Sequence, residues 1–258
     1  MSNYNQFSQS LSNPTPLFGK VGTFFLIIFV LLFFIVTQMA TRVMAAFLLM
    51  PAQMAADISG TVMQAAYNGT VLSVSLCLTF AIMYFLIVTI IKIRKKAIRQ
   101  YLPMVSFDFS IAVKIFILWV LFVIGNEFFT KLAERNPMVF MDKIYATADP
   151  LWLLLLSFVI IVPIYEELIF RGLLWQTTAE QFVNKKTGAI FASVLTASIF
   201  AVVHVQYDFF EIVRIFILAL ILGYARYRSG SLLLPILMHI FNNGVSLWQY
   251  SLMTGNVG

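Results

Sequence analysis

The 258-residue chain is too apolar for a soluble globular protein. Hydrophobic residues make up 61% of it and charged residues only 11%, whereas about 25% of the residues of soluble domains are charged. The mean hydropathy of +0.91 therefore predicts an all-α, polytopic membrane protein whose apolar surface faces lipid. The single cysteine, Cys77, excludes a disulfide framework.

Seven stretches are long and apolar enough to cross a bilayer as helices, which takes about 20 residues each. They are residues 21–39, 70–91, 110–129, 151–175, 188–205, 209–227 and 231–250. An eighth candidate, 43–56, is broken by Pro51 and is either an interfacial segment or a continuation of the first helix. We expect an N-terminal tail (1–20), N-terminal transmembrane helices (21–149) and a C-terminal part of transmembrane helices (150–250).

The basic residues predict the orientation of the chain, because basic loops stay in the cytoplasm. One side has eleven of them and the other has four. The eleven are Lys20, Lys92, Arg94, Lys95, Lys96, Arg99, Arg171, Lys185, Lys186, Arg226 and Arg228. We therefore expect a cytoplasmic N-terminus and an external C-terminus. Because topology explains the net charge of +6, nucleic acid is not an expected partner, and membrane lipids are.

The fourth stretch contains two adjacent carboxylates and an arginine, Glu166, Glu167 and Arg171. Ionisable residues inside a span are costly and usually functional. Glu167 and Arg171 are four residues apart, so they share a helix face and predict an ion pair. Glu166 is turned about 100° away from that face, which favours a role as a general base.

Both histidines of the chain lie in later apolar stretches. Phe200 and His204 are one turn apart near the end of the fifth stretch, and His239 and Asn243 are one turn apart in the seventh. Isolated polar groups in apolar helices need partners. We therefore expect these side chains to converge with the carboxylates on one internal polar site.

The order of these motifs resembles that of the CAAX-protease and bacteriocin-processing (CPBP, or Abi) family of intramembrane endopeptidases. The motifs are Glu-Glu-x-x-x-Arg, Phe-x-x-x-His and His-x-x-x-Asn, and they occupy roughly residues 150–250. The resemblance implies hydrolysis of prenylated, leader or other membrane-associated peptides. It implies Glu166, His204, His239 and Asn243 as catalytic residues, with Glu167, Arg171 and Phe200 in supporting roles.

Two mechanisms are compatible with these residues. In the first, Glu166 activates a water that His204 helps to hold, and His239 and Asn243 stabilise the oxyanion. In the second, Glu166, His204 and His239 bind a catalytic zinc ion, since three ligands and a water suffice. The resemblance favours the metal-free glutamate base, so no cofactor is expected, with zinc as the alternative.

The depth of these residues constrains how the helices sit in the bilayer. If the fourth helix is embedded over about 157–176 and the fifth begins near 193, Glu166 and His204 both lie roughly 15 Å from the cytoplasmic side. This arrangement predicts a water-filled cavity in the inner half of a bacterial inner (plasma) membrane. The alternatives are a catalytically silent immunity or scaffold protein and a proton-coupled transporter.

Overall fold

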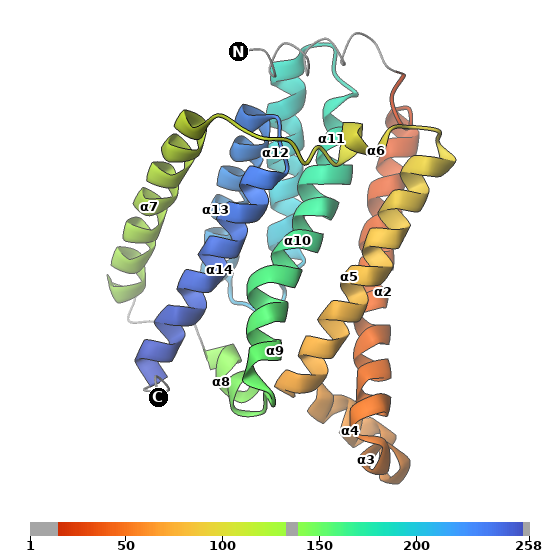
Figure 1. Ribbon diagram of the computed structural model, residues 1–258, viewed down its shortest axis with the longest axis vertical. Helices are drawn as coiled ribbons and strands as arrows, with labels where there is room; N and C mark the ends of the chain where they lie inside the picture. Colours follow the sequence, from red (N-terminus) through yellow and green to blue (C-terminus); the bar gives the residue numbers. More distant parts are fainter. Residues whose placement is uncertain (1–14, 133–138, 255–258) are drawn as a thin grey trace. The chain divides into compact units, whose positions relative to one another are not determined.

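The computed structural model describes residues 15–132 and 139–254, and all regular secondary structure in these two ranges is helical. The all-α class is therefore confirmed. The predicted N-terminal tail lies largely outside the described residues. The helices before the C-terminal part are α2 (Lys20–Leu49), α3 (Pro51–Ala56), α4 (Ile58–Ala65), α5 (Gly69–Ile93), α6 (Ile98–Tyr101), α7 (Phe109–Leu132) and α8 (Val139–Ala146) (Figure 1).

The C-terminal part begins with one long helical stretch in which α-helical and π-helical segments alternate. Its segments are α9 (Leu151–Leu155), η1 (Leu156–Ile161), α10 (Val162–Glu167), η2 (Leu168–Leu174) and α11 (Trp175–Ala179). The helices that follow are α12 (Lys185–Val202), α13 (Phe209–Ser229) and α14 (Leu233–Thr254).

Among the described residues, five helices are long and apolar enough to cross a membrane, as an integral membrane protein requires. They are Lys20–Leu49, Gly69–Ile93, Phe109–Leu132, Leu151–Ala179 and Lys185–Val202. The other two expected spans coincide with the more polar helices α13 and α14, so seven crossings stay a prediction. The eighth candidate divides, because its first part continues α2 to Leu49 and the rest forms the short helix α3.

The described helices divide into two compact units. Unit 1 comprises Met1–Ile27, Ile87–Ala133 and Glu167–Met238, and unit 2 comprises Ile28–Leu86, Glu134–Glu166 and His239–Gly258. The boundary between the units falls inside the Glu166-Glu167 motif. Each unit is described by itself below.

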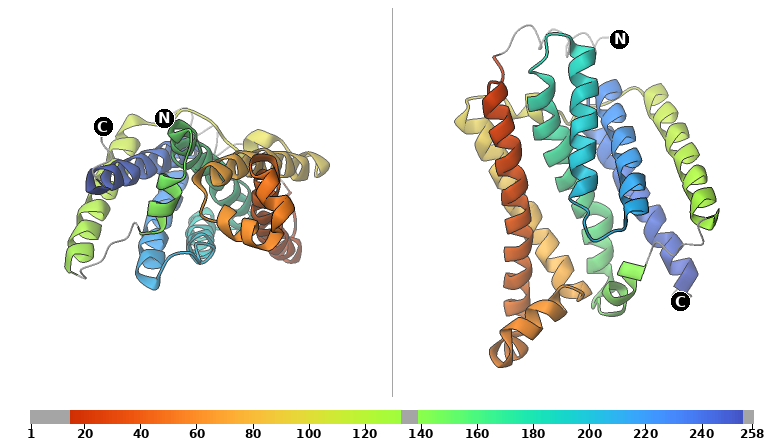
Figure 2. Two further views of the ribbon diagram at one scale, coloured as in Figure 1. Left: turned by 90° about the horizontal axis from the view of Figure 1, so that it is seen from below. Right: turned by 180° about the vertical axis from the view of Figure 1, so that it is seen from behind.

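In unit 1, α13 lies beside both α12 and α7 (Figures 1 and 2). The Asn184 side chain caps the start of α12 by accepting from the amide of Thr187. α12 therefore begins at Lys185, earlier than the starts near 188 and 193 that the sequence suggested. A Cβ atom on Gly223 would lie 3.0 Å from Ser193, so glycine permits the close approach of α13 to α12.

The chain before α2 is bound to unit 1 by side chains from distant segments. The amide of Leu17 donates to Glu180 Oε1 at 2.7 Å, and Arg94 Nε donates to the carbonyl of Leu17 at 3.0 Å. Tyr101 Oη donates to Glu180 Oε2 at 3.1 Å. Burial raises the pKa of the Glu180 carboxyl to about 7, although the hydrogen bonds from Leu17 and Tyr101 and the charge of Lys96 favour its ionised form.

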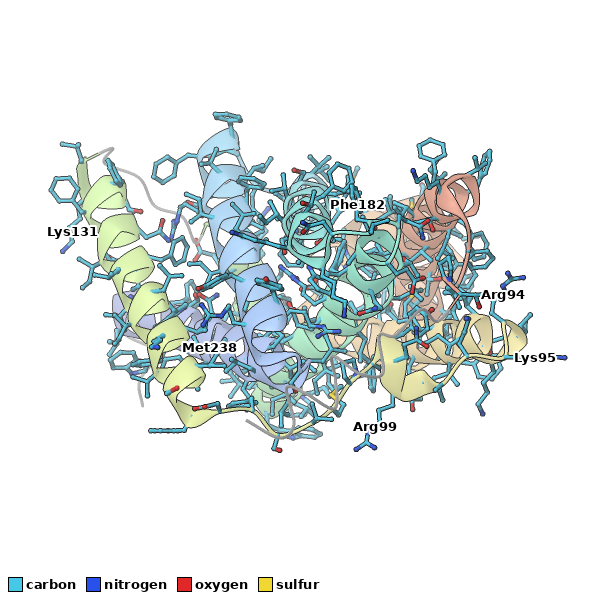
Figure 3. The ribbon with its side chains drawn as sticks, turned by 90° about the horizontal axis from the view of Figure 1, so that it is seen from above. Arg94, Lys95, Arg99, Lys131, Phe182 and Met238 are labelled. Carbon is cyan, nitrogen blue, oxygen red and sulfur yellow. The ribbon has the colours of Figure 1, made fainter. Side chains whose placement is uncertain are left out.

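The basic residues used to predict orientation fall into exposed and buried sets. Lys95 and Arg99 are exposed and point away from the ribbon after α5 (Figure 3). Arg171 and Arg226, which the sequence analysis counted on the same side, are 0% and 1% exposed. They are therefore parts of the protein interior and not loop residues. Without them, nine basic residues remain on the predicted cytoplasmic side and four on the other, so the predicted orientation is the same.

Unit 2 is held together by small apolar residues and a few polar contacts. Thr41 of α2 and Thr79 of α5 share a hydrogen bond of 2.8 Å between their hydroxyl groups. Near the far end of α14, Tyr250 Oη donates to Asp142 of α8 at 2.9 Å. The ring of Tyr165, one residue before Glu166, packs on Phe34 of α2 with 6.0 Å between the ring centroids.

Candidate active site

Glu166 and His239 contact each other inside unit 2. The distance between Glu166 Oε2 and His239 Nε2 is 3.8 Å, and the two residues are 7% and 4% exposed. They come from α10 and α14. A carboxylate and an imidazole buried side by side are able to exchange or share a proton, which makes this pair suitable for acid–base chemistry.

Asn243 lies one turn beyond His239 on α14 and contacts the same long stretch. Its Nδ2 donates to the carbonyl of Phe158 at 3.0 Å. In η1 the amide of Val162 donates to the carbonyl of Ser157, five residues earlier. The same spacing would make residue 163 the donor to the carbonyl of Phe158. That residue is a proline, which has no N–H group. The side chain of Asn243 supplies the hydrogen bond that the backbone cannot supply.

The ion pair expected between Glu167 and Arg171 is present in unit 1. Arg171 Nη1 lies 2.8 Å from Glu167 Oε1, and both side chains are 0% exposed. Arg171 Nη2 also donates to the carbonyl of Ala219 in α13 at 3.2 Å. The guanidinium lies over the ring of Phe200 at 4.6 Å, a cation–π contact that is stronger away from water.

His204 lies just beyond α12 and not within it, because the helix ends at Val202. The sequence prediction that His204 belongs to the helix is therefore wrong. The imidazole is still held one turn from Phe200: its Nδ1 is 2.6 Å from the carbonyl of Phe200, and the two ring centroids are 4.7 Å apart. The imidazole also lies beside the ring of Tyr207, with 6.3 Å between the centroids.

The expected site residues thus form two groups, one in each unit. Glu166, His239 and Asn243 belong to unit 2. Glu167, Arg171, Phe200 and His204 belong to unit 1 and contact one another in sequence from the ion pair to the imidazole. The peptide bond between Glu166 and Glu167 joins the two groups in the covalent chain.

A catalytic zinc ion takes three protein ligands and a water. The described residues contain no group of three or more His, Cys, Asp and Glu side chains that could hold a metal ion. The three expected zinc ligands, Glu166, His204 and His239, belong to two different units, so the zinc alternative stays a prediction.

Sequence reasoning missed the role of the π-helical segments and of Arg226. Arg226 is buried beside η2, where Nε donates to the carbonyl of Arg171 at 3.2 Å. Pro163 was the one signal for η1, because its missing N–H leaves a carbonyl to be satisfied. No spacing in the sequence distinguishes a buried Arg226 from a basic residue in a loop.

Comparison with known proteins finds a similar family for the part of the chain that contains these residues. Residues 148–245 match the family described as "Type II CAAX prenyl endopeptidase Rce1-like". This match confirms the resemblance that the three motifs indicated.

A relative from Escherichia coli, named "Uncharacterized 24.3 kDa protein", is 34% identical over 105 residues. The matched region covers 39% of this chain and 46% of that protein, so the chain spans about half of its relative. No solved structure matches the chain.

Proposed function

We propose that this protein is an intramembrane endopeptidase that hydrolyses membrane-associated peptides with a water activated by Glu166. The observation that carries the proposal is the buried contact between Glu166 and His239, 3.8 Å apart, within the segment that matches the CAAX endopeptidase family. Buried ionisable residues on membrane helices are costly and are kept for function.

Glu166 acts as the general base in this mechanism. It takes a proton from a water molecule, and the oxygen of that water forms a bond to the scissile carbonyl carbon. The family resemblance implies His204 as a further catalytic residue that helps to hold this water. The C=O π electrons move to the carbonyl oxygen and produce a tetrahedral oxyanion. A well-placed general base typically contributes 10²–10⁴-fold to the rate.

His239 and Asn243 stabilise the oxyanion. His239 lies against Glu166, and an N–H of its ring is directed to the negative charge. The amide of Asn243 has two hydrogens, and its contact with Phe158 uses one of them. The second is available to the oxyanion, while the first fixes the side chain in place, as preorganised stabilisation requires.

The reaction ends when the C–N bond breaks. The oxyanion re-forms the carbonyl, the C–N electron pair leaves with the amine, and protonated Glu166 returns its proton to that nitrogen. Glu167, Arg171 and Phe200 take no part in the bond changes. Their contacts hold the turn that follows Glu166 and the imidazole of His204.

The substrates are prenylated, leader or other membrane-anchored peptides. This assignment rests on the family match and on the apolar helices around the motifs. The predicted location is a bacterial inner membrane, with a cytoplasmic N-terminus and an external C-terminus. The excess of basic residues on one side supports this orientation.

The test is cleavage of prenylated and membrane-anchored peptides by the purified protein in lipid nanodiscs. Glu166→Gln and His204→Gln are each expected to lower kcat by about 10²-fold or more. Glu211→Gln is the matched control, because Glu211 also pairs with an arginine, Arg214, at 2.7 Å but lies outside the motifs. Full activity of folded Glu166→Gln would refute the proposal.

A further inference from the structure

Arg226 is a buried cation for which the mechanism above has no use. It lies near the end of α13 and is 1% exposed. Its guanidinium stacks over the ring of Trp175 at 4.9 Å. Burying an arginine away from water is costly unless its N–H groups are bound, so its contacts indicate what it stabilises.

The hydrogen bonds of Arg226 go to the segment that follows the Glu166-Glu167 motif. Nε donates to the carbonyl of Arg171 at 3.2 Å, and Nη2 donates to Gln176 Oε1 at 3.3 Å. Both acceptors are neutral. Arg226 therefore binds the backbone of η2 and the start of α11.

The carbonyl of Arg171 lies where the hydrogen bonding of the helix changes. In η2 the amide of Trp175 donates to the carbonyl of Phe170, five residues earlier, and α-helical bonding, four residues apart, resumes at α11. Arg226 donates to the carbonyl of Arg171 at this change. The contact therefore links α13 to the end of the π-helical segment.

The two arginines connect the same two helical segments in opposite directions. Arg171 of η2 donates to the carbonyl of Ala219 in α13 at 3.2 Å, and Arg226 of α13 donates to the carbonyl of Arg171. Two hydrogen bonds from charged groups thus fix the position of η2 along α13. Because Arg171 also pairs with Glu167, these bonds set the orientation of the turn that begins at Glu166.

We propose that Arg226 is a positioning residue for the hydrolytic reaction, which it serves by holding the π-helical turn after Glu166 and Glu167 in its active geometry. This inference rests on the proposed endopeptidase function. A displacement of about 1 Å at a catalytic group costs about 100-fold in rate. Substitution of Arg226 is therefore expected to lower kcat, while KM changes little.

The experiment compares Arg226→Gln with Arg228→Gln in lipid nanodiscs. Arg228→Gln is the matched control because it removes the same charge from α13. Arg228 itself is exposed, and its guanidinium donates to the hydroxyl of Tyr224 in the same helix. We measure kcat and KM for peptide cleavage, together with amide hydrogen exchange over residues 168–175. Arg226→Gln should lower kcat about 100-fold and speed exchange in these residues, whereas Arg228→Gln should leave both unchanged.

Arg226→Lys separates the hydrogen bond from the charge. Lysine keeps a positive charge but lacks the planar Nε–H donor, so kcat should fall and exchange should rise in this variant too. If only the buried charge matters, Arg226→Lys will match the wild type, and the proposal is overturned. The Lys variant also decides the question if Arg226→Gln does not fold.

The two proposals fail in different ways. If the wild type cleaves no peptide, the endopeptidase function fails, while the exchange measurement still shows whether Arg226 holds the turn. If the wild type is active and a folded Arg226→Gln variant keeps its kcat, the positioning role is overturned even if exchange changes. Unchanged exchange in residues 168–175 overturns it as well.

Discussion

The buried ion pair between Glu167 and Arg171 provides a quantitative test of the candidate site. Both side chains are fully buried and the contact is 2.8 Å long. Removing one partner leaves an uncompensated charge in the interior, whereas replacing both with apolar residues of similar size removes the charges together. The single substitutions are Glu167→Leu and Arg171→Met, and the double variant combines them.

The structure gives the expected size of each loss in the free energy of unfolding. Each single substitution should cost about 3–5 kcal/mol, because it leaves one buried charge unpaired. Arg171→Met should lie at the upper end, since it also removes the bond to Ala219 and the contact with Phe200. The double variant should lose less than the sum by at least about 2 kcal/mol.

Reversible unfolding by sodium dodecyl sulfate, followed by circular dichroism, measures these free energies in detergent micelles. Glu211→Leu, Arg214→Met and their double variant form the control cycle, because that pair is 15–20% exposed and should show a coupling of only about 0–1 kcal/mol. Additive losses at Glu167 and Arg171 would refute the reasoning. So would single losses no larger than those of the control.

Three further predictions follow from individual contacts. Asn243→Leu should destabilise the fold by about 1–3 kcal/mol, because the part-buried carbonyl of Phe158 loses its side-chain donor. An unfolding free energy equal to that of the wild type would contradict this role. The pKa of the Glu180 carboxyl is about 7 in the folded protein, above its ordinary value of 4.5. As the pH rises, the unfolded chain therefore loses this proton first, so the free energy of unfolding should fall between these two pH values and then level off. Glu180→Gln should remove this slope from the pH dependence of unfolding, and an unaltered slope would contradict the assignment. In a Cys77→Ser background, Lys95→Cys should react with an impermeant thiol reagent only from the cytoplasmic side and Gln53→Cys only from outside, and the reverse pattern would contradict the orientation.

The sequence predicted those parts of the site that depend on helical spacing. The pairing of Glu167 with Arg171 and the shared face of His239 and Asn243 follow from a separation of four residues, because side chains at that spacing meet on any helix. The apolar stretches likewise predicted the helices, since their length is set by the thickness of the bilayer. These relations are local, so a single sequence contains them.

The rest of the site depends on changes in backbone bonding that leave no periodic signal. The carbonyls of Phe158 and Arg171 lie in the π-helical segments, and they accept hydrogen bonds from side chains of α14 and α13. His204 falls outside α12 because the helix ends at Val202, although apolar residues continue to Val205. The burial of Arg226 depends on which helix packs against it, which residue counts do not reveal.

The most direct test of the central claim is the single-turnover rate of peptide cleavage by the wild type and by Glu166→Gln in lipid nanodiscs, before and after treatment with a strong zinc chelator. With Glu166 as the general base, the Gln variant should be about 10²–10⁴-fold slower, and the chelator should leave the wild-type rate unchanged. Equal rates for the two proteins would contradict the account. A wild-type rate that is lost on chelation and restored by zinc would replace the glutamate mechanism with a metal-dependent one.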